Sequence, residues 1–334
     1  MKSALVFTLA LLAVLAVKAA AAAVQFSYTE EWHMWKTQHG KSYGSVREEL
    51  ERHLVWLANR EYINAHNQNS HIFGFTLAMN HLGDITDAEY EEIYSTYCDI
   101  DHGNYTKVYD PSRYSSTLPD AIDWRTNNAV TSIKDQGYCG ASYAFSAVGA
   151  LEGANALATG TLTSLSEQNI IDCSIPYGNH GCKGGNMYDT YLYIVANEGI
   201  DTSASYPYSA KQLGCSYSVS GRGARISNSI SIESGSEEGL QSAVANIGPI
   251  AVAVDAQSSA FRYYSSGVYS STQCSSSTLT HAMVVTGYGT YNGKEYYLVK
   301  NSFGTNWGMN GYILMARNKY NQCGIATDAS YPTL

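Results

Sequence analysis

Charged side chains are scarce in this chain of 334 residues, at 15% of the sequence, and they are biased toward acid, with 20 Lys and Arg against 29 Asp and Glu. The formal net charge of −9 leaves no basic footprint for nucleic acid or for an anionic membrane surface. Hydrophobic residues still make up 45% of the chain, which is the composition of a globular protein and not of a disordered acidic tail. Because charges are few, we expect hydroxyl and amide groups to form much of the surface.

Long apolar runs are missing beyond the N-terminus, so no membrane span is expected there. The first residues follow the three-part pattern of a secretory signal, with Lys2, an apolar run over residues 4–17 and then small residues. We therefore expect a signal peptide over residues 1–23, cleaved among the alanines 20–23. An uncleaved signal anchor is the alternative. The expected product is a secreted protein.

Cysteine occurs at seven positions, and export would place these residues in an oxidising compartment. Cys98 precedes the expected processing junction, which leaves six cysteines behind it. An even number favours three disulfides, for which about 15 connectivities are possible. The competing interpretation is a zinc site at His180 and Cys182, within NHGCKGG. No second pair of ligands accompanies them, so we expect no metal site and no cofactor.

The leading part of the chain is rich in charge and in helix-forming residues. Trp32, Trp35 and His39, followed by leucines, recur at helical spacing over residues 28–67. The leucines are Leu50, Leu54 and Leu57. The stretch 71–86 then predicts a short strand and a turn. A polar, proline-containing stretch over residues 101–120 suits a linker or cleavage zone, and it contains a glycosylation sequon at Asn104.

The part after Pro119 is helical first and β-rich afterwards, which predicts an α+β fold with two subdomains and a cleft where they meet. Three helices are expected, at residues 142–158, 166–171 and 186–197. Four strands are expected within residues 248–256, 281–289, 294–302 and 311–318, where β-branched and aromatic residues are bounded by turn signals.

Three residues far apart in the sequence form a candidate catalytic set. Ser142 stands at the start of a predicted helix, His281 opens a predicted strand, and Asn301 follows another. A hydroxyl, an imidazole and an amide that orients the imidazole can act as nucleophile, base and orienter. Each residue alone has a simpler interpretation, because a serine at a helix start is more often a cap and a lone histidine is more often a packed polar residue.

The chain resembles the papain-like cysteine proteases of the cathepsin L type over nearly its full length, through motifs that follow that family's order. The motifs are DQGYCGASYAFSAVGALEG, LSEQNIIDCS, GCKGGNM, HAMVVTGYG and NSFGTNWGMNGY. The leading part is similar to the family's propeptide, with the helical ERFNIN pattern and a second motif, AMNHLGD. The residues of the helical pattern are Glu48, Arg52, Trp56, Asn59, Ile63 and Asn67.

The resemblance implies a papain-like fold, with a helical left domain, a β-barrel-like right domain and a helical inhibitory prosegment before them. It implies a propeptide over residues 24–118 and a mature domain over residues 119–334. Ser142 would stand at the nucleophile position, His281 at the base, Asn301 at the orienter and Gln136 at the oxyanion donor, with Trp307 as an aromatic residue near the site. The implied disulfides are Cys139–Cys182, Cys173–Cys215 and Cys274–Cys323.

Three departures from the protease pattern surround this implied site. Ser142 replaces the catalytic cysteine, Tyr143 replaces the tryptophan after it, and Phe303 replaces the tryptophan that shields the histidine and asparagine. With the flanking sequences, these changes are similar to the silicateins, which are cathepsin L relatives associated with the silica spicules of sponges. This resemblance implies silicic acid or a silicon alkoxide as substrate, self-assembly into spicule axial filaments, and removal of the prosegment by another protease.

The serine changes the expected chemistry. A hydroxyl is far less acidic than a thiol, so Ser142 must pass its proton to neutral His281 during attack, and peptidase activity should be weak or absent. Tetrahedral silicon can accept a fifth oxygen ligand, so hydrolysis and condensation at Si–O bonds are the expected reactions. Two alternatives stay open: a catalytically idle structural protein that templates silica, and a slow serine-type peptidase.

Two further regions are candidates for substrate binding. The resemblance places Asn186, Met187 and Asp328 in the main specificity pocket, where polar side chains would favour a hydroxylated ligand; the alternative is that the polar side chains turn to solvent. The Tyr- and Ser-rich run over residues 258–280 has the composition to bind silanols or to promote self-association. The alternative is an ordinary polar loop and strand edge, which patch size would decide.

Overall fold

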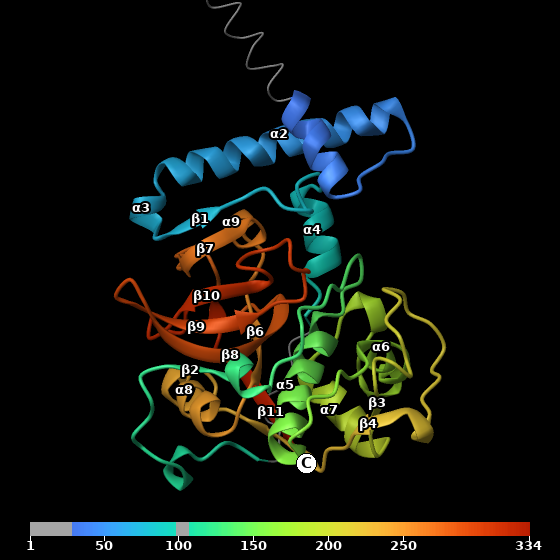
Figure 1. Cartoon of the computed structure of the whole chain (residues 1–334), viewed down its shortest axis with the longest axis vertical. Helices are drawn as coiled ribbons and strands as arrows, with labels where there is room; N and C mark the ends of the chain where they lie inside the picture. The colour runs from blue at the N-terminus through green and yellow to red at the C-terminus, as the bar shows by residue number, and fades with distance from the viewer. Residues whose placement is uncertain (1–28, 98–106) are drawn as a thin grey trace, which may run out of the picture.

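The computed structural model describes residues 29–97 and 107–334 of the chain. Figure 1 shows three parts within them: a helical cap at one end, a sheet-rich part beneath it, and a helical part beside the sheet. The expected signal peptide, Cys98 and the sequon at Asn104 lie outside the described residues.

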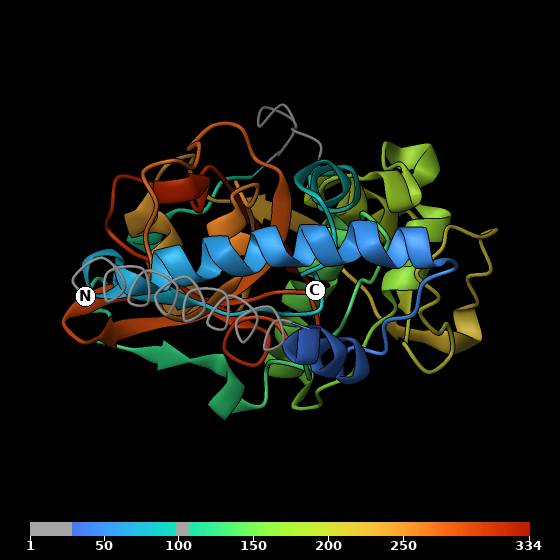
Figure 2. The same cartoon turned by 90° about the horizontal axis from the view of Figure 1, so that it is seen from above.

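The cap is formed by the leading part of the chain, residues 29–97. Residues 29–38 are helical, and α2 (Val46–Gln68), α3 (Ser70–Phe73), β1 (Phe75–Leu77) and α4 (Asp87–Tyr94) follow. Helix α2 begins where the Ser45 side chain accepts a hydrogen bond from the amide of Glu48. Seen from above, α2 lies across both the sheet-rich and the helical parts (Figure 2).

The interior of the cap differs in two ways from the sequence prediction. Leu50 and Leu54 are 58% and 59% exposed, so they do not form the buried face of α2. Trp56 and Ile63 are the buried residues of that helix, and Trp32 and Trp35 pack around Trp56. The indoles therefore form the cap's core, and of the three leucines only Leu57 packs against it. The predicted strand also begins later than expected, because residues 70–73 form helix α3.

The sheet-rich part has a strand order of β1-β7-β10-β9-β8-β6-β11-β5, with β2 paired to β8. Its central strand β6 has the sequence IAVAV and is buried along its whole length, as a strand covered on both faces should be. The prosegment strand β1 adds antiparallel to β7, so the cap joins the sheet through main-chain bonds. The strands are β2 (Ile122–Asp123), β5 (Asn228–Ser231), β6 (Ile250–Val254), β7 (Tyr264–Tyr269), β8 (His281–Tyr291), β9 (Lys294–Lys300), β10 (Tyr312–Ala316) and β11 (Asp328–Thr333), and a separate pair is β3 (Ile200–Asp201) with β4 (Arg222–Ala224).

Helix α5 (Ser142–Thr159) lies between the sheet and helices α6 and α7, and most of its residues are buried. Small alanines and glycines let the neighbouring elements approach it closely; a Cβ at Gly149 would lie 2.8 Å from Val284 of β8. The remaining helices are α6 (Glu167–Cys173), α7 (Met187–Ala196), α8 (Glu237–Asn246) and α9 (Ser259–Arg262). Short 3-10 turns are η2 (Pro111–Arg113), η3 (Trp124–Asn127), η4 (Ile175–Tyr177), η5 (Gly181–Lys183), η6 (Val219–Gly221) and η7 (Gln322–Gly324).

Separate hydrophobic cores lie on the two sides of α5. One core is built from the sheet, α8 and the docked cap, and the other from α5, α6 and α7. The predicted helices and strands of the mature part are therefore present, and they form the two expected subdomains. No helix in the described part of the chain is both long and apolar enough to cross a membrane.

The disulfides pair as the family resemblance implies. They are Cys139–Cys182, Cys173–Cys215 and Cys274–Cys323. The first of these uses the Cys182 sulfur, so the zinc interpretation of NHGCKGG is wrong. Among residues 29–97 and 107–334, no group of three His, Cys, Asp or Glu side chains is placed to hold a metal ion.

The Tyr- and Ser-rich run over residues 258–280 divides into a largely buried tyrosine part and a serine-rich part, 270–278, whose residues are all exposed or half-buried. It contains helix α9 and strand β7, and Tyr263, Tyr264 and Tyr269 are buried in the sheet-side core. Their rings supply packing area while their hydroxyls find partners inside the protein, as Tyr264 does with the carbonyl of Gly267 at 2.6 Å. The tyrosines of this run are therefore mainly structural.

Candidate active site

Ser142 is the first residue of α5, and it is only 1% exposed. The N-cap residue is Ala141, so the Ser142 hydroxyl does not cap the helix. Its Oγ instead accepts a hydrogen bond from the main-chain amide of Ala282, at 3.2 Å. Ala282 directly follows His281 at the start of β8, so this bond brings the start of β8 against the start of α5.

The imidazole of His281 is held by Asn301. Its Nε2 lies 2.8 Å from Asn301 Oδ1, and because an amide oxygen only accepts hydrogen bonds, Nε2 carries the hydrogen. The other ring nitrogen, Nδ1, has no hydrogen bond of normal geometry within the described residues. In the neutral ring Nδ1 therefore carries the lone pair, while the main chain of Tyr94 interacts with the ring in this covered form.

Burial sets the protonation state of His281. The side chain is fully buried, and this burial lowers its pKa to about 4, although the hydrogen bond to Asn301 and the main chain of Tyr94 act in the opposite direction. Part of the burial comes from Phe303, whose ring centroid lies 4.8 Å from that of the imidazole. The imidazole is thus neutral at physiological pH. A neutral base suits a serine hydroxyl, whereas a thiolate would need an imidazolium beside it.

Gln136 lies in the same region and is completely buried. Its Nε2 donates to the carbonyl oxygen of Cys139 at 2.9 Å, and its Oε1 accepts from the hydroxyl of Ser302 at 2.6 Å. These contacts fix the amide with one of its two N–H bonds in use. The second N–H is the one that remains for a ligand oxygen.

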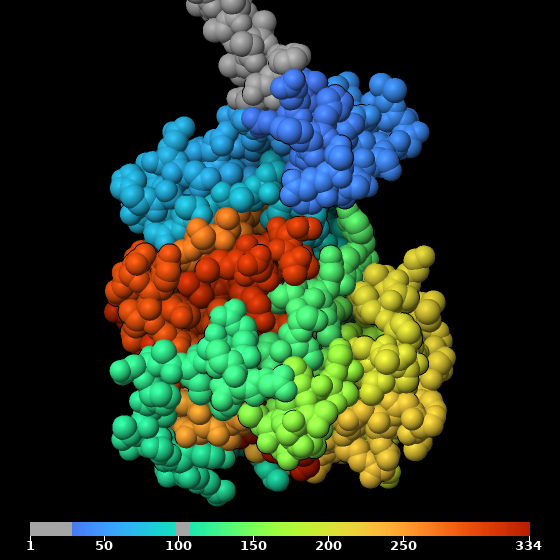
Figure 3. Space-filling view, viewed as in Figure 1, coloured from blue at the N-terminus to red at the C-terminus, as the bar shows by residue number. Residues whose placement is uncertain are grey.

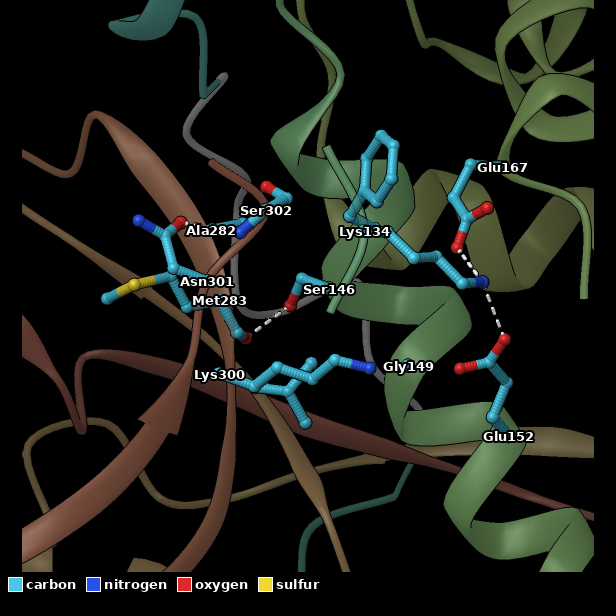
Figure 4. A pocket seen from close by; sticks show the side chains of 12 residues that line it. Lys134, Ser146, Gly149, Glu152, Glu167, Ala282, Met283, Lys300, Asn301 and Ser302 are labelled. Carbon is cyan, nitrogen blue, oxygen red and sulfur yellow. Dashed lines mark hydrogen bonds and ion pairs between the residues drawn. The ribbon is translucent and has the colours of Figure 1, made fainter. Parts of the chain in front are cut away.

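A buried charge network lines the same cavity as Asn301, and no sequence pattern predicted it. Lys134 Nζ is 2.7 Å from Glu152 Oε1 and 2.5 Å from Glu167 Oε1 (Figure 4). Burial disfavours the Lys134 ammonium, but the two carboxylates raise its pKa overall. Lys300 donates to the carbonyl and hydroxyl of Thr131, both at 2.9 Å, and burial lowers its pKa to about 8.

This network connects the elements that carry the catalytic candidates. Glu152 belongs to α5, which begins at Ser142, and Lys300 ends the strand before Asn301. The four charged residues come from distant segments with no shared spacing, so only the three-dimensional fold brings them together. The Thr131 hydroxyl, which accepts a hydrogen bond from Lys300, donates to Glu152 Oε2 at 2.5 Å, so the network links β9 to α5.

The cap covers the site directly. Tyr94 packs on Phe303 at a centroid distance of 4.8 Å, the Thr96 hydroxyl donates to the carbonyl of Gly140 at 3.1 Å, and the Tyr97 amide donates to the carbonyl of Thr280 at 3.1 Å. The contact is close: a Cβ at Gly184 would lie 2.0 Å from the Thr96 carbonyl oxygen. Figure 3 shows the cap as a continuous layer over one end of the mature part. This arrangement excludes a substrate from Ser142.

The four residues expected to bind substrate have different surroundings. Asp328 is buried and accepts a hydrogen bond from the Tyr97 hydroxyl, and Met187 is fully buried at the start of α7. Asn186 caps α7, with Oδ1 accepting from the Asp189 amide at 2.8 Å and Nδ2 donating to the Asp189 carboxyl group at 2.7 Å.

The capping bonds commit the Asn186 side chain to α7, so its predicted role in recognising a hydroxylated ligand is not supported. Neither Asn186 nor Asp328 turns to solvent. Trp307 is fully buried beside Phe303 and donates its indole N–H to the carbonyl of Arg262 at 3.0 Å. It therefore supports the aromatic wall behind His281 and is itself covered in this form.

Comparison with known proteins identifies the fold and the covering segment. Residues 118–333 match the model of the papain family cysteine proteases, and residues 32–90 match the cathepsin propeptide inhibitor domain (I29). The chain belongs to the papain family, in a cathepsin L-like form that carries its propeptide. The form described here is thus of the zymogen type.

The relatives include cathepsins and a protein named silicatein. The chain is 48% identical to the silicatein of Petrosia ficiformis, over 92% of this chain and 94% of that protein, and 46% identical to cathepsin S of Bos taurus, over 91% and 92%. Among solved structures, it is similar to digestive procathepsin L 3 of the Tenebrio molitor larval midgut, with a TM-score of 0.86 and 41% identity over 92% of this chain and 99% of that one.

Proposed function

We propose that the processed protein catalyses hydrolysis and condensation at Si–O bonds, with Ser142 as nucleophile and His281 as general base. The observation that carries this proposal is the arrangement of His281, whose Nε2 is held by Asn301 while the next residue, Ala282, donates its amide to Ser142 Oγ. The similarity to a protein named silicatein supports silicon as the reacting centre.

The proposed reaction proceeds through one covalent intermediate, a Ser142–O–Si species. His281 Nδ1 takes the Ser142 proton while Oγ bonds to the silicon of an alkoxysilane or of silicic acid. The Si–OR bond then breaks, and the leaving alcohol or water receives that proton from His281. Water, or the hydroxyl of a second silanol, next attacks the Ser142–O–Si species, which yields a silanol or an Si–O–Si linkage and returns the proton to Ser142.

The serine favours this chemistry over peptide hydrolysis. The helix N-terminus contributes roughly 0.3–1 kcal/mol toward a negative charge, which is far too little to ionise a hydroxyl. Attack must therefore use general-base catalysis, and the neutral His281 described above is suited to it. The remaining N–H of Gln136 and the amide of Ser142 are the groups that would stabilise charge on a silicon-bound oxygen.

Activity requires removal of the prosegment, because Tyr94, Thr96 and Tyr97 cover the site. We place the mature domain at residues 119–334 and the propeptide at residues 24–118. Since Ser142 is a weak attacker of peptides, another protease of the secretory route would carry out the cleavage. The processed protein would then reach the extracellular spicule filament and assemble there with further copies.

Following silica release from a silicon alkoxide tests the mechanism, with processed wild type, Ser142→Ala and His281→Ala compared under the same conditions. We expect both variants to lose about 10²-fold or more of the catalysed rate, the scale of general-base catalysis. Ser146→Ala, which removes another buried hydroxyl of α5, is the matched control and should keep the rate.

Two other outcomes would each favour an alternative. Silica formation at the wild-type rate by the Ser142→Ala protein, with its assembly intact, would exclude the covalent route and leave a templating structural protein. Turnover of a peptide substrate that His281→Ala abolishes would instead indicate a slow serine-type peptidase.

A further inference from the structure

The last part of the prosegment forms a docking strand that lies apart from the active site. Residues 107–114, here called the tail, precede the start of the papain-family match at residue 118. Figure 1 places the tail at the lower end of the molecule, below α8 and near the C-terminus, whereas the cap helices lie at the upper end. The tail therefore contributes nothing to covering Ser142.

Main-chain bonds add the tail to the edge of the sheet. Val108 forms a parallel bridge with Ser231 of β5. The Tyr109 amide donates to the Ser231 carbonyl at 2.8 Å, and the Ser231 amide donates to the Lys107 carbonyl at 3.1 Å. Strand β5 is the terminal strand of the sheet order, with β11 on its other side. The tail thus occupies an edge that would otherwise present unpaired amides and carbonyls.

One tyrosine anchors the tail in the mature part. Tyr109 is only 6% exposed and belongs to the sheet-side core. Its hydroxyl lies 2.9 Å from the Ser242 hydroxyl on α8, and its ring packs edge-on against Tyr331 of β11, at a centroid distance of 6.2 Å. An aromatic ring with a satisfied hydroxyl is the type of side chain that dominates peptide docking.

We infer that removal of the prosegment opens this groove as a second binding site, for an extended, tyrosine-bearing peptide strand of a partner chain. Cleavage near residue 118 separates the tail from the mature domain, and departure of the tail leaves the Ser231 main chain and the Tyr109 pocket without their occupant. Strand addition supplies affinity through the main chain, and the pocket selects the side chain. The tail itself is the template for the ligand: a residue pairing with β5, then tyrosine, then a turn formed by Asp110 and Pro111.

The test uses the full chain with a recognition sequence for a site-specific protease placed in the exposed residues 115–117. After cleavage, the prosegment is removed by size exclusion, and retained folding is verified by circular dichroism. A fluorescent peptide with the sequence of residues 107–114, KVYDPSRY, is then titrated by anisotropy. We expect the peptide to bind the cleaved, separated protein and not the uncut chain, in which the groove is filled.

Peptide variants separate this site from unspecific adhesion without any change to the protein. Replacing the tyrosine that corresponds to Tyr109 by alanine should weaken binding about tenfold or more, because a buried aromatic anchor is lost. Replacing it by phenylalanine should weaken binding about 2- to 10-fold, because one hydrogen bond is lost. Equal affinity of all three peptides would overturn the inference.

Protein variants locate the binding at β5 and not in the active-site cleft. Ser231→Pro removes the amide that faces the tail and should abolish binding, whereas Ser231→Ala keeps the amide and should preserve it. Ser242→Ala leaves the strand edge intact and removes the same hydrogen bond as the phenylalanine peptide does. It should therefore weaken binding of the unaltered peptide by a similar factor, about 2- to 10-fold. The inference fails if Ser231→Pro, shown to be folded, binds normally, or if the cleaved prosegment never leaves the groove at neutral or acid pH.

Discussion

Tyr97 of the prosegment donates its phenolic hydrogen to the carboxyl group of Asp328, 231 residues further along the chain. Asp328 begins strand β11, and both side chains are buried. The Tyr97 amide also bonds to the Thr280 carbonyl. A residue of the cap therefore occupies the position in which the family resemblance places the specificity pocket. The Asp328 carboxyl group at this position binds a hydroxyl donor.

Tyr97→Phe should weaken the hold of the prosegment. The buried hydrogen bond is lost while the ring is retained, which corresponds to about 1–3 kcal/mol. We expect the free energy of prosegment dissociation, measured from inhibitor-like rebinding of the cleaved prosegment, to fall by that amount. Tyr62→Phe, a change in a 41% exposed ring of α2, is the control. An unchanged Tyr97→Phe protein would mean that the Asp328 contact contributes nothing to docking.

Acid should destabilise the cap more than the mature part. Of the nine histidines, only His180 and His281 follow residue 118. Burial is the main cause that lowers the pKa of four cap histidines, and for one of them, His81, the value falls to about 4 against an ordinary 6.5; Asp135 and Asp84 near it act in the opposite direction, while Lys41 and His39 add to the lowering. The other three are His39, His53 and His66.

The direction in which the stability of the cap changes with pH follows from proton linkage. The docked cap binds fewer protons than the unfolded cap, so its stability is full above pH 6.5 and is lost as the pH falls from 6.5 toward about 4. Amide hydrogen exchange of α2 and α4, measured across this pH range, should show the loss of cap stability as reduced protection. His81→Gln should reduce the pH dependence, and a cap whose exchange rates stay constant, after correction for intrinsic exchange, between pH 7 and pH 4 would contradict the prediction.

The pH profile of silicon chemistry should report on His281. Only the neutral imidazole can take the Ser142 proton, so activity should fall as the pH falls through the pKa of His281. That pKa is about 4 while the prosegment covers the ring, and solvent access after processing should raise it toward the ordinary 6.5. Rates of alkoxide hydrolysis by the processed protein should therefore fit one ionisation between these limits. A profile unchanged in His281→Ala would exclude this assignment.

Ser142→Cys should restore the chemistry of the protease family. A thiol at the start of α5, with His281 beside it, can ionise to a thiolate–imidazolium pair. We expect the processed variant to be labelled by a thiol-directed epoxide and to cleave peptide substrates about 10²-fold or more faster than wild type, because the nucleophile no longer depends on proton removal during attack. Wild type, whose six described cysteines all form disulfides, is the control. A folded variant without labelling would mean that the aromatic changes around the site, and not the serine alone, prevent proteolysis.

Lys134→Met should destabilise the mature part strongly. It leaves Glu152 and Glu167 buried without their shared cation, and breaking a buried pair in this way costs about 3–5 kcal/mol. Denaturant unfolding of the full chain would measure the change. Arg47→Met removes the exposed Arg47–Glu51 pair and should change stability by less than about 1 kcal/mol. Equal effects of the two substitutions would show that the buried network has no special role.

The sequence predicted those features in which a local pattern and the final environment agree. Helix α5 begins at Ser142 and strand β8 begins at His281, as expected, because each carries a continuous run of residues suited to its element. The position of Asn301 relative to His281 followed from the family resemblance, and the structure brings the two together. The roles of Ser142, His281 and Gln136 in catalysis remain predictions.

The features that the sequence did not reveal depend on tertiary contacts. Leu50 and Leu54 match a helical period, but the neighbouring indoles bury more area and take the core position. The tyrosines of residues 258–280 look polar by composition, yet β7 buries them between β1 and β10. Asn186 was placed in the pocket by the family resemblance; the structure shows that it caps α7, a frequent role for asparagine, and its part in binding stays a prediction.

The hydrogen bond from the Ala282 amide to Ser142 Oγ affects how the site responds to its substrate. A sulfur atom in that position would scarcely accept such a bond, because thiols are weak acceptors. The hydroxyl oxygen accepts this bond with one of its two lone pairs and keeps the other for an incoming atom. An oxygen at this position is therefore anchored to strand β8 through the Ala282 amide, as a sulfur atom would scarcely be.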